Sequence, residues 1–226
     1  MNIKYNYINL VALGNFNPAI ISPNFIKDNC GLNLGELTEQ SPPFVPVLKK
    51  LQFENVLITV DLERLELKET KVSDDLETEV LEIFNSFYQV LPYTPLTAVG
   101  VNINCRLLFV DNEESGAIEK KVASPESYIH FFGVKQVHVN ETAILTETEK
   151  TWIGSSFVID AVNRLTRRID LRREKDSLIL NYNHEAGNLR ESKMNRDIRL
   201  KNLFEGYGKF RNEFLDFIKY LEVNQR

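Results

Sequence analysis

The chain has little that could form disulfides or bind metals, with two cysteines, Cys30 and Cys105, and three histidines among 226 residues. Two thiols this far apart form neither a disulfide framework nor a zinc motif. We therefore expect free thiols, as in a reducing compartment. No signal peptide is recognisable at the start, and no apolar run approaches the roughly 20 residues that span a bilayer. These absences predict a cytoplasmic protein with no metal site and no membrane contact.

The common catalytic signatures are also missing. The sequence contains no G-x-x-x-x-G-K-[ST] phosphate loop, no G-x-G-x-x-G fingerprint and no H-E-x-x-H zinc motif. It also lacks the G-x-S-x-G elbow and the kinase set. A general base made of His184 and Glu185 is a weaker alternative, because such a base needs specific partners. We expect a protein that is not an enzyme and has no cofactor.

Charge is unevenly spread along the chain. The net charge of −5 combines −9 over residues 1–150 with +4 over residues 151–226. The acidic total disfavours a general nucleic-acid binder. One predicted strand nevertheless carries a row of arginines on one face that could contact phosphates, namely Arg164, Arg168 and Arg172. Asp170 and Glu174 lie close enough in sequence to neutralise part of this row.

Hydrophobic periodicity predicts an α+β fold. Apolar residues at steps of three and four predict amphipathic helices over about 74–91 and 196–222. Alternation predicts strands, with a β-bulge where the apolar phase changes inside the second, over residues 5–13, 55–69, 96–110, 134–148, 155–172 and 177–185. The class is a mostly antiparallel, curved β-sheet packed against the two long helices.

Connecting segments are predicted from Pro, Gly, Asn and Ser. Ser22-Pro23 is typical of a helix start and predicts a short helix through Asp28, and Ser124-Pro125 predicts another over 124–131. Residues 31–49 and 111–116 are predicted to be loops. We expect one domain over 1–226, with 1–92 and 93–226 as an alternative subdivision into two similar halves.

Two strands carry pairs of asparagines, which are disfavoured in strands. Asn102 and Asn104 share a predicted strand face with Arg106, and Asn181 and Asn183 share a face of another strand. If the two strands are neighbours, these side chains could bind a small polar or anionic ligand. The alternative is an ordinary solvated sheet face.

The leading functional hypothesis is a non-enzymatic intracellular binding or assembly protein that acts through protein–protein contacts, including self-association. The Pro-rich segment 31–49 is the candidate contact loop. One alternative is a small-molecule-binding domain in which a curved sheet wraps the helix at 196–222. Another is a phosphate or nucleic-acid binder that uses the arginine row.

Overall fold

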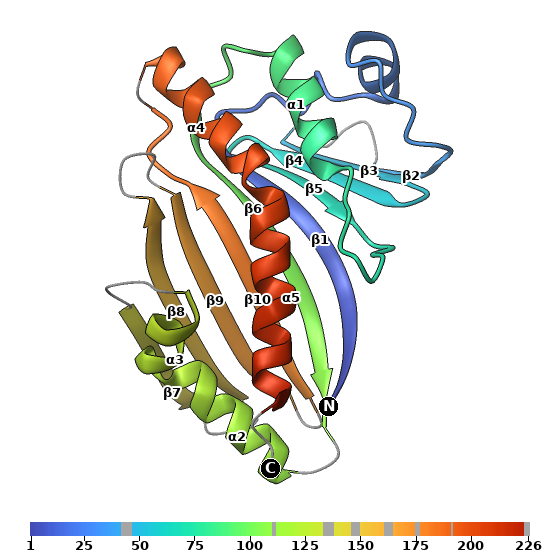
Figure 1. Cartoon of the computed structure of the whole chain (residues 1–226). Helices are drawn as coiled ribbons and strands as arrows, with labels where there is room; N and C mark the ends of the chain where they lie inside the picture. The colour runs from blue at the N-terminus through green and yellow to red at the C-terminus, as the bar shows by residue number, and fades with distance from the viewer. Residues whose placement is uncertain are drawn as a thin grey trace. The chain divides into compact units, whose positions relative to one another are not determined.

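The computed structural model spans the chain and describes residues 1–41, 47–109, 112–132, 138–145, 150–160, 165–174, 177–190 and 192–223. The strands are β1 (Asn2–Gly14), β2 (Leu37–Gln40), β3 (Leu48–Phe53), β4 (Val56–Asp61), β5 (Arg64–Glu69), β6 (Leu96–Leu108), β7 (His138–Leu145), β8 (Lys150–Asp160), β9 (Leu165–Glu174) and β10 (Ser177–Ala186). The helices are η1 (Phe25–Asn29), α1 (Val80–Val90), α2 (Asn112–Ala123), α3 (Pro125–Phe132), α4 (Lys193–Glu205) and α5 (Tyr207–Val223). Figure 1 shows these elements.

The chain divides into two compact units. Unit 1 comprises Met1–Asn6, Ile103–Ala186 and Lys201–Arg226, and unit 2 comprises Tyr7–Asn102 and Gly187–Leu200. Strands β1 and β6 therefore contribute residues to both units. The pairings of β2 through β5 and of β7 through β10 are antiparallel. The predicted α+β class and antiparallel sheet are confirmed, and the single domain stays a prediction.

In unit 2 the strands follow the order β2-β3-β4-β5-β1-β6. Leu67 of β5 pairs with Leu10 of β1 on one side and with Ile58 of β4 on the other, and all three side chains are fully buried. Side chains opposite one another in an antiparallel pair point to the same face of the sheet. This face forms the core of unit 2, and α1 packs beside it with Phe84 and Phe87 buried.

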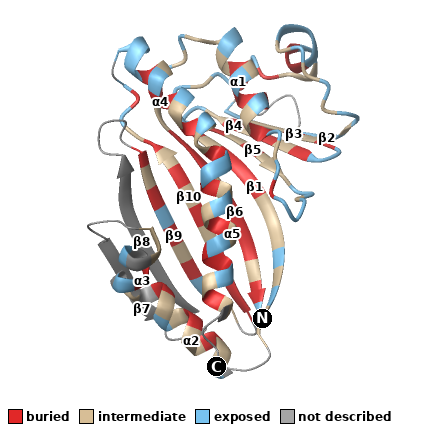
Figure 2. Cartoon of the chain, in the orientation of Figure 1, coloured by how far each residue is buried: buried red, intermediate tan, exposed pale blue. Residues whose placement is uncertain are grey.

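In unit 1 the order is β6-β10-β9-β8-β7. Burial alternates along β9 and β10, as Figure 2 shows, so one face of these strands is buried. On that face the ring of Tyr182 stacks on Phe210 of α5 at 4.6 Å between centroids. The C-terminal helix α5 thus packs on the sheet, which is not strongly curled within this unit (Figure 1).

Both long helices differ from their predicted extents. The first is only α1, because Leu76 adopts a positive φ of 58° and the chain from 74 to 79 is not helical. The second is divided at Gly206 into α4 and α5. A Cβ atom at Gly206 would lie 2.8 Å from the Asn202 carbonyl oxygen and 3.5 Å from His184 Nε2. The contact with the Asn202 carbonyl, on the preceding turn, is too short for a side chain, so glycine fits at the break between α4 and α5.

The segment predicted as one strand over 55–69 is a hairpin of β4 and β5. The prediction of a β-bulge there is wrong. Asp61 Oδ1 accepts hydrogen bonds from the backbone N–H groups of Glu63 and Arg64, both at 2.7 Å. Aspartate makes tight turns in this way. The change of apolar phase therefore marks a reversal of the chain rather than an inserted residue.

The remaining segments agree with the sequence-based predictions in part. The predicted loop at 31–49 contains β2 and the start of β3, and the described part of the predicted loop at 111–116, residues 112–116, begins helix α2. The predicted strand at 155–172 covers parts of β8 and β9. The strands at 96–110 and 177–185 and the helix at 124–131 are confirmed as β6, β10 and α3. Ser22 Oγ accepts a hydrogen bond from Phe25 N at 3.1 Å, as expected for a helix cap.

The order of elements along the chain occurs twice. A long strand, β1 or β6, is followed by a helical connection, then by four consecutive strands, and then by helix. The first series ends with β2 to β5 and α1, and the second ends with β7 to β10 and α4–α5.

Candidate functional site

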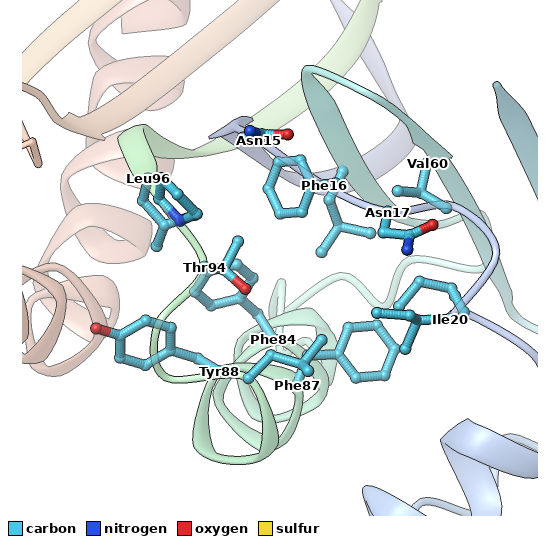
Figure 3. Close-up of a pocket in the computed structure, with 14 residues that line it drawn as sticks. Asn15, Phe16, Asn17, Ile20, Val60, Phe84, Phe87, Tyr88, Thr94 and Leu96 are labelled. Atoms are coloured by element: carbon cyan, nitrogen blue, oxygen red, sulfur yellow. The ribbon is translucent and has the colours of Figure 1, made fainter.

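Unit 2 contains a cavity of about 210 Å³ between α1 and the ends of its central strands. Figure 3 shows it as a ring of mainly apolar side chains. Two phenylalanines and Tyr88 come from α1, and Val60 and Leu65 come from β4 and β5. The remaining lining comes from the segment after β1 and from the connection between α1 and β6. That lining consists of Asn15, Phe16, Asn17, Ile20, Ile21, Leu91, Thr94, Pro95 and Leu96.

Helix α1 presents one continuous face to this cavity. Phe84, Phe87 and Tyr88 follow one another at steps of three and one residues, and Leu91 continues the spacing directly after the helix ends. This spacing places them on one side of a helix. Phe84 and Phe87 are 2% and 3% exposed, so the cavity wall is also part of the core.

Backbone hydrogen bonds hold the segment that follows β1. Asn15 N donates to the Pro95 carbonyl oxygen and Phe16 N donates to the Leu62 carbonyl oxygen, both at 2.9 Å. A Cβ atom at Gly14 would lie 2.3 Å from Pro95 O, so this close approach requires glycine. Asn17 Oδ1 then accepts a hydrogen bond from Ala19 N at 3.0 Å and forms the turn beside the cavity.

The residues that line the cavity carry no ionisable group except the phenol of Tyr88. That hydroxyl donates to Asp197 Oδ1 at 2.6 Å and accepts from Arg196 Nε at 2.8 Å. Burial and the bond to Asp197 raise the pKa of Tyr88, although Arg196 lowers it. Figure 3 shows the phenol oxygen pointing away from the other labelled side chains. The cavity therefore faces the aromatic ring rather than the hydroxyl.

This arrangement favours binding over chemistry. An engineered apolar cavity of about 150 Å³ binds benzene, so a cavity of about 210 Å³ has room for a substituted ring. A charged ligand would lose its hydration here without gaining a partner.

The polar site expected from sequence lies in unit 1, except for Asn102, which belongs to the unit 2 segment of β6. The site was expected only if the two asparagine-bearing strands are neighbours, and strands β6 and β10 are neighbours in the sheet. Asn104 Oδ1 accepts from Asn6 Nδ2 at 2.8 Å. Arg106 Nη1 donates to Ser177 Oγ and to Glu174 Oε2, both at 2.9 Å. These polar groups are engaged with one another.

Asn181 and Asn183 of β10 pair across the strands with Asp170 and Arg168 of β9. Burial raises the pKa of Asp170, although the bond from Arg168 lowers it. The two amides therefore lie beside an ion pair within the chain, between Arg168 and Asp170. The ligand-binding role of this face stays a prediction.

The arginine row is paired with carboxylates where it is described. Arg168 lies 2.9 Å from Asp170, and Arg172 lies 2.6 Å from Glu174. Both guanidinium side chains remain about half exposed. Arg164 lies outside the described residues. The phosphate-binding role of this row stays a prediction.

His184 is buried beneath α5 rather than placed for proton transfer. Its ring stacks on Phe210 at 5.4 Å, and its Nδ1 lies 3.4 Å from the Thr166 carbonyl oxygen. Burial and the charge of Arg167 lower the pKa of His184 to about 3. Glu185 points to the opposite face, because neighbouring strand residues alternate. The side chains of His130 and His138 lie outside the described residues.

No protein-family model matches the chain, and no curated protein matches it significantly. In the described part of the chain, no helix is long and apolar enough to cross a membrane. Over the same residues, no group of three or more His, Cys, Asp or Glu side chains is arranged to hold a metal ion.

Sequence reasoning missed the cavity. It found the apolar stripe of α1 and predicted that this stripe packs against the sheet. The unusual density of apolar and turn residues over 14–23 was the available signal. A stripe that fills space and one that borders a cavity have the same periodicity, so only packing distinguishes them.

Proposed function

We propose that this chain is a binding protein for a compact, neutral, ring-containing ligand that occupies the cavity of unit 2. The supporting observation is an apolar cavity of about 210 Å³ lined by four aromatic side chains. Concave, mostly apolar pockets with a few polar groups are the usual form of small-molecule sites. This proposal develops the small-molecule alternative and moves its site from α5 to α1.

The shape of the lining restricts the ligand class. Ile20 is 42% exposed at the cavity, whereas Val60, Leu65 and Leu96 are at most 3% exposed. The ligand enters past Ile20 and contacts the buried strand residues. Aromatic side chains favour offset or edge-on contact with another ring, so a flat apolar ring fits this lining best.

The repeated order of elements supports a second proposal, that the chain consists of two halves of similar build. Each series of strand, helical connection, four strands and helix would form one of two halves of similar build. Assembly through protein contacts also stays a prediction, since self-association does not depend on the cavity.

The first test is binding of toluene, measured by isothermal titration calorimetry and by ligand-observed NMR. We expect saturable 1:1 binding to the wild-type chain. Ile20→Trp places an indole at the cavity entrance and should weaken toluene binding at least tenfold. Because Ile20 is partly exposed, this variant should keep its fold, which circular dichroism checks.

The matched control is Met194→Trp, which adds the same indole at a residue that is 68% exposed and does not line the cavity. This variant should bind toluene as the wild type does. Absence of saturable binding to the wild type, or equal weakening in both variants, would contradict the proposal.

A further inference from the structure

The entrance of the cavity is bordered by a tight turn over residues 17–20. Asn17 Oδ1 accepts a hydrogen bond from Ala19 N at 3.0 Å, and the Asn17 carbonyl oxygen accepts one from Ile20 N at 3.1 Å. Pro18, whose ring fixes φ, is buried between them. Asn17 and Ile20 both line the cavity. Two hydrogen bonds and a proline therefore hold this side of the entrance in one conformation before a ligand arrives.

The same turn fixes the direction of the Asn17 amide. Only the oxygen of an amide can accept from a backbone N–H, so the bond from Ala19 N distinguishes Oδ1 from Nδ2. The two N–H groups of Nδ2 take no part in this bond. Figure 3 shows the Asn17 nitrogen turned toward Ile20 and the interior of the ring of lining residues, with the oxygen turned outward. Asn17 therefore presents a hydrogen-bond donor at the edge of a mainly apolar lining.

The rest of the lining determines what this donor can bind. Val60 and Phe84 are at most 2% exposed, whereas Asn17 is exposed, so a ring held against the buried residues would place a substituent beside the amide. Among the described residues that line the cavity, none is Lys, Arg or His. A carboxylate would lose its hydration there without gaining an ionic partner. A neutral carbonyl oxygen can accept from an amide N–H without such a cost.

We propose that the ligand of the cavity is an aromatic carbonyl compound, with its ring against α1 and its carbonyl oxygen accepting a hydrogen bond from Asn17 Nδ2. Asn17 is then the residue that distinguishes a ring bearing a carbonyl group from a purely apolar ring of the same shape. A few polar groups that fix orientation are usual in apolar small-molecule sites. The inference rests on the proposed function and names the ligand class of that same site.

The test compares acetophenone with cumene, which has nearly the same shape but no hydrogen-bond acceptor. Asn17→Asp keeps an oxygen for Ala19 N and so preserves the turn, but it removes both N–H donors. Isothermal titration calorimetry measures the two dissociation constants. The ratio of the acetophenone constant to the cumene constant should rise about fivefold to tenfold in this variant, as expected for the loss of one hydrogen bond.

Asn33→Asp is the matched control. Asn33 Oδ1 accepts a hydrogen bond from Gly35 N at 3.4 Å in the same kind of turn, and Asn33 is exposed in unit 2 but does not line the cavity. This variant adds the same negative charge to the same unit and preserves its own turn. It should keep the wild-type ratio of the two dissociation constants.

Asn17→Ala removes the donors without adding a charge, and circular dichroism checks its fold. It should raise the ratio by about the same factor as Asn17→Asp, because both variants lose the same hydrogen bond. A rise in Asn17→Asp alone would mean repulsion by the new carboxylate and would overturn the inference.

Toluene separates this inference from the proposed function. Saturable binding of toluene to the wild type, together with no binding of acetophenone or with an unchanged ratio in the Asn17 variants, would overturn this inference alone. Failure of the wild type to bind toluene would instead remove the proposed function beneath it.

Discussion

The two units use aromatic helices in different ways. In unit 1 the ring of Phe210 on α5 is surrounded by partners, with Tyr182 at 4.6 Å, His184 at 5.4 Å and the Arg167 guanidinium at 4.8 Å. In unit 2 the phenylalanines of α1 border a cavity of about 210 Å³. An aromatic stripe on a helix therefore does not by itself determine whether the space beside it is filled.

The polar groups of the two regions also differ. Unit 1 buries Arg167 at 2% exposure, with Nη2 bonded to Glu213 at 3.0 Å, and places neutral His184 under the same helix. In unit 2 Arg196 and Asp197 of α4 form hydrogen bonds with the hydroxyl of Tyr88, whose ring lines the cavity. Polar groups contribute to the packed core in one unit, and in the other they bind the hydroxyl of a tyrosine whose ring lines the cavity.

The largest expected difference comes from enlarging one leucine in each region. Leu180→Phe adds atoms to the packed face of β10, where the side chain is fully buried, and should destabilise the protein by about 1–3 kcal/mol. Leu96→Phe adds the same atoms at the cavity lining, where they have space, and should cost less than about 1 kcal/mol. Urea unfolding measures both. Equal costs would contradict the contrast between a filled and an open region.

The next effect is the pH dependence that His184 gives to unit 1. Its pKa falls from 6.5 to about 3 on folding, so folding favours the neutral ring. The contribution of His184 is complete above pH 6.5 and is lost as the pH falls toward 3, because the unfolded chain then binds the proton first. At pH 5 the loss is about 2 kcal/mol.

His184→Phe isolates this contribution. The variant should lose about 2 kcal/mol less stability between pH 7.5 and pH 5 than the wild type, as measured by urea unfolding at both values. All other titrating groups are common to the two proteins. An identical pH dependence would show that His184 is not buried in its neutral form.

The smallest expected difference is in the stability changes caused by alanine at two nearby glycines of unit 1, Gly206 and Gly208. Gly208→Ala should stabilise the protein by up to about 1 kcal/mol, because alanine favours the helix and a Cβ atom there meets nothing within 4 Å. Gly206→Ala should destabilise it by about 1 kcal/mol or more, because the same atom would lie 2.8 Å from Asn202 O. Thermal unfolding compares them. Equal shifts in melting temperature would argue against the close contact between Gly206 and the Asn202 carbonyl oxygen.

Sequence predictions succeeded where one strand or helix carries its own pattern. Alternation located β6 and β10, and Ser124-Pro125 located α3. They failed where a tight turn kept the apolar pattern almost continuous, as at Asp61 between β4 and β5. Of the candidate site, the sequence showed the stripe on α1 but neither Phe16 as its neighbour nor the hydrogen bond from Arg196 to Tyr88.

The sequence alone determined the α+β class, because side-chain periodicity follows from helix and strand geometry and is readable within a few residues. It also determined that no common catalytic motif is present. Only the tertiary structure decided which apolar stripe borders a cavity. That outcome depends on contacts between residues as distant in sequence as Tyr88 and Arg196, 108 positions apart, and such contacts leave no periodic signal.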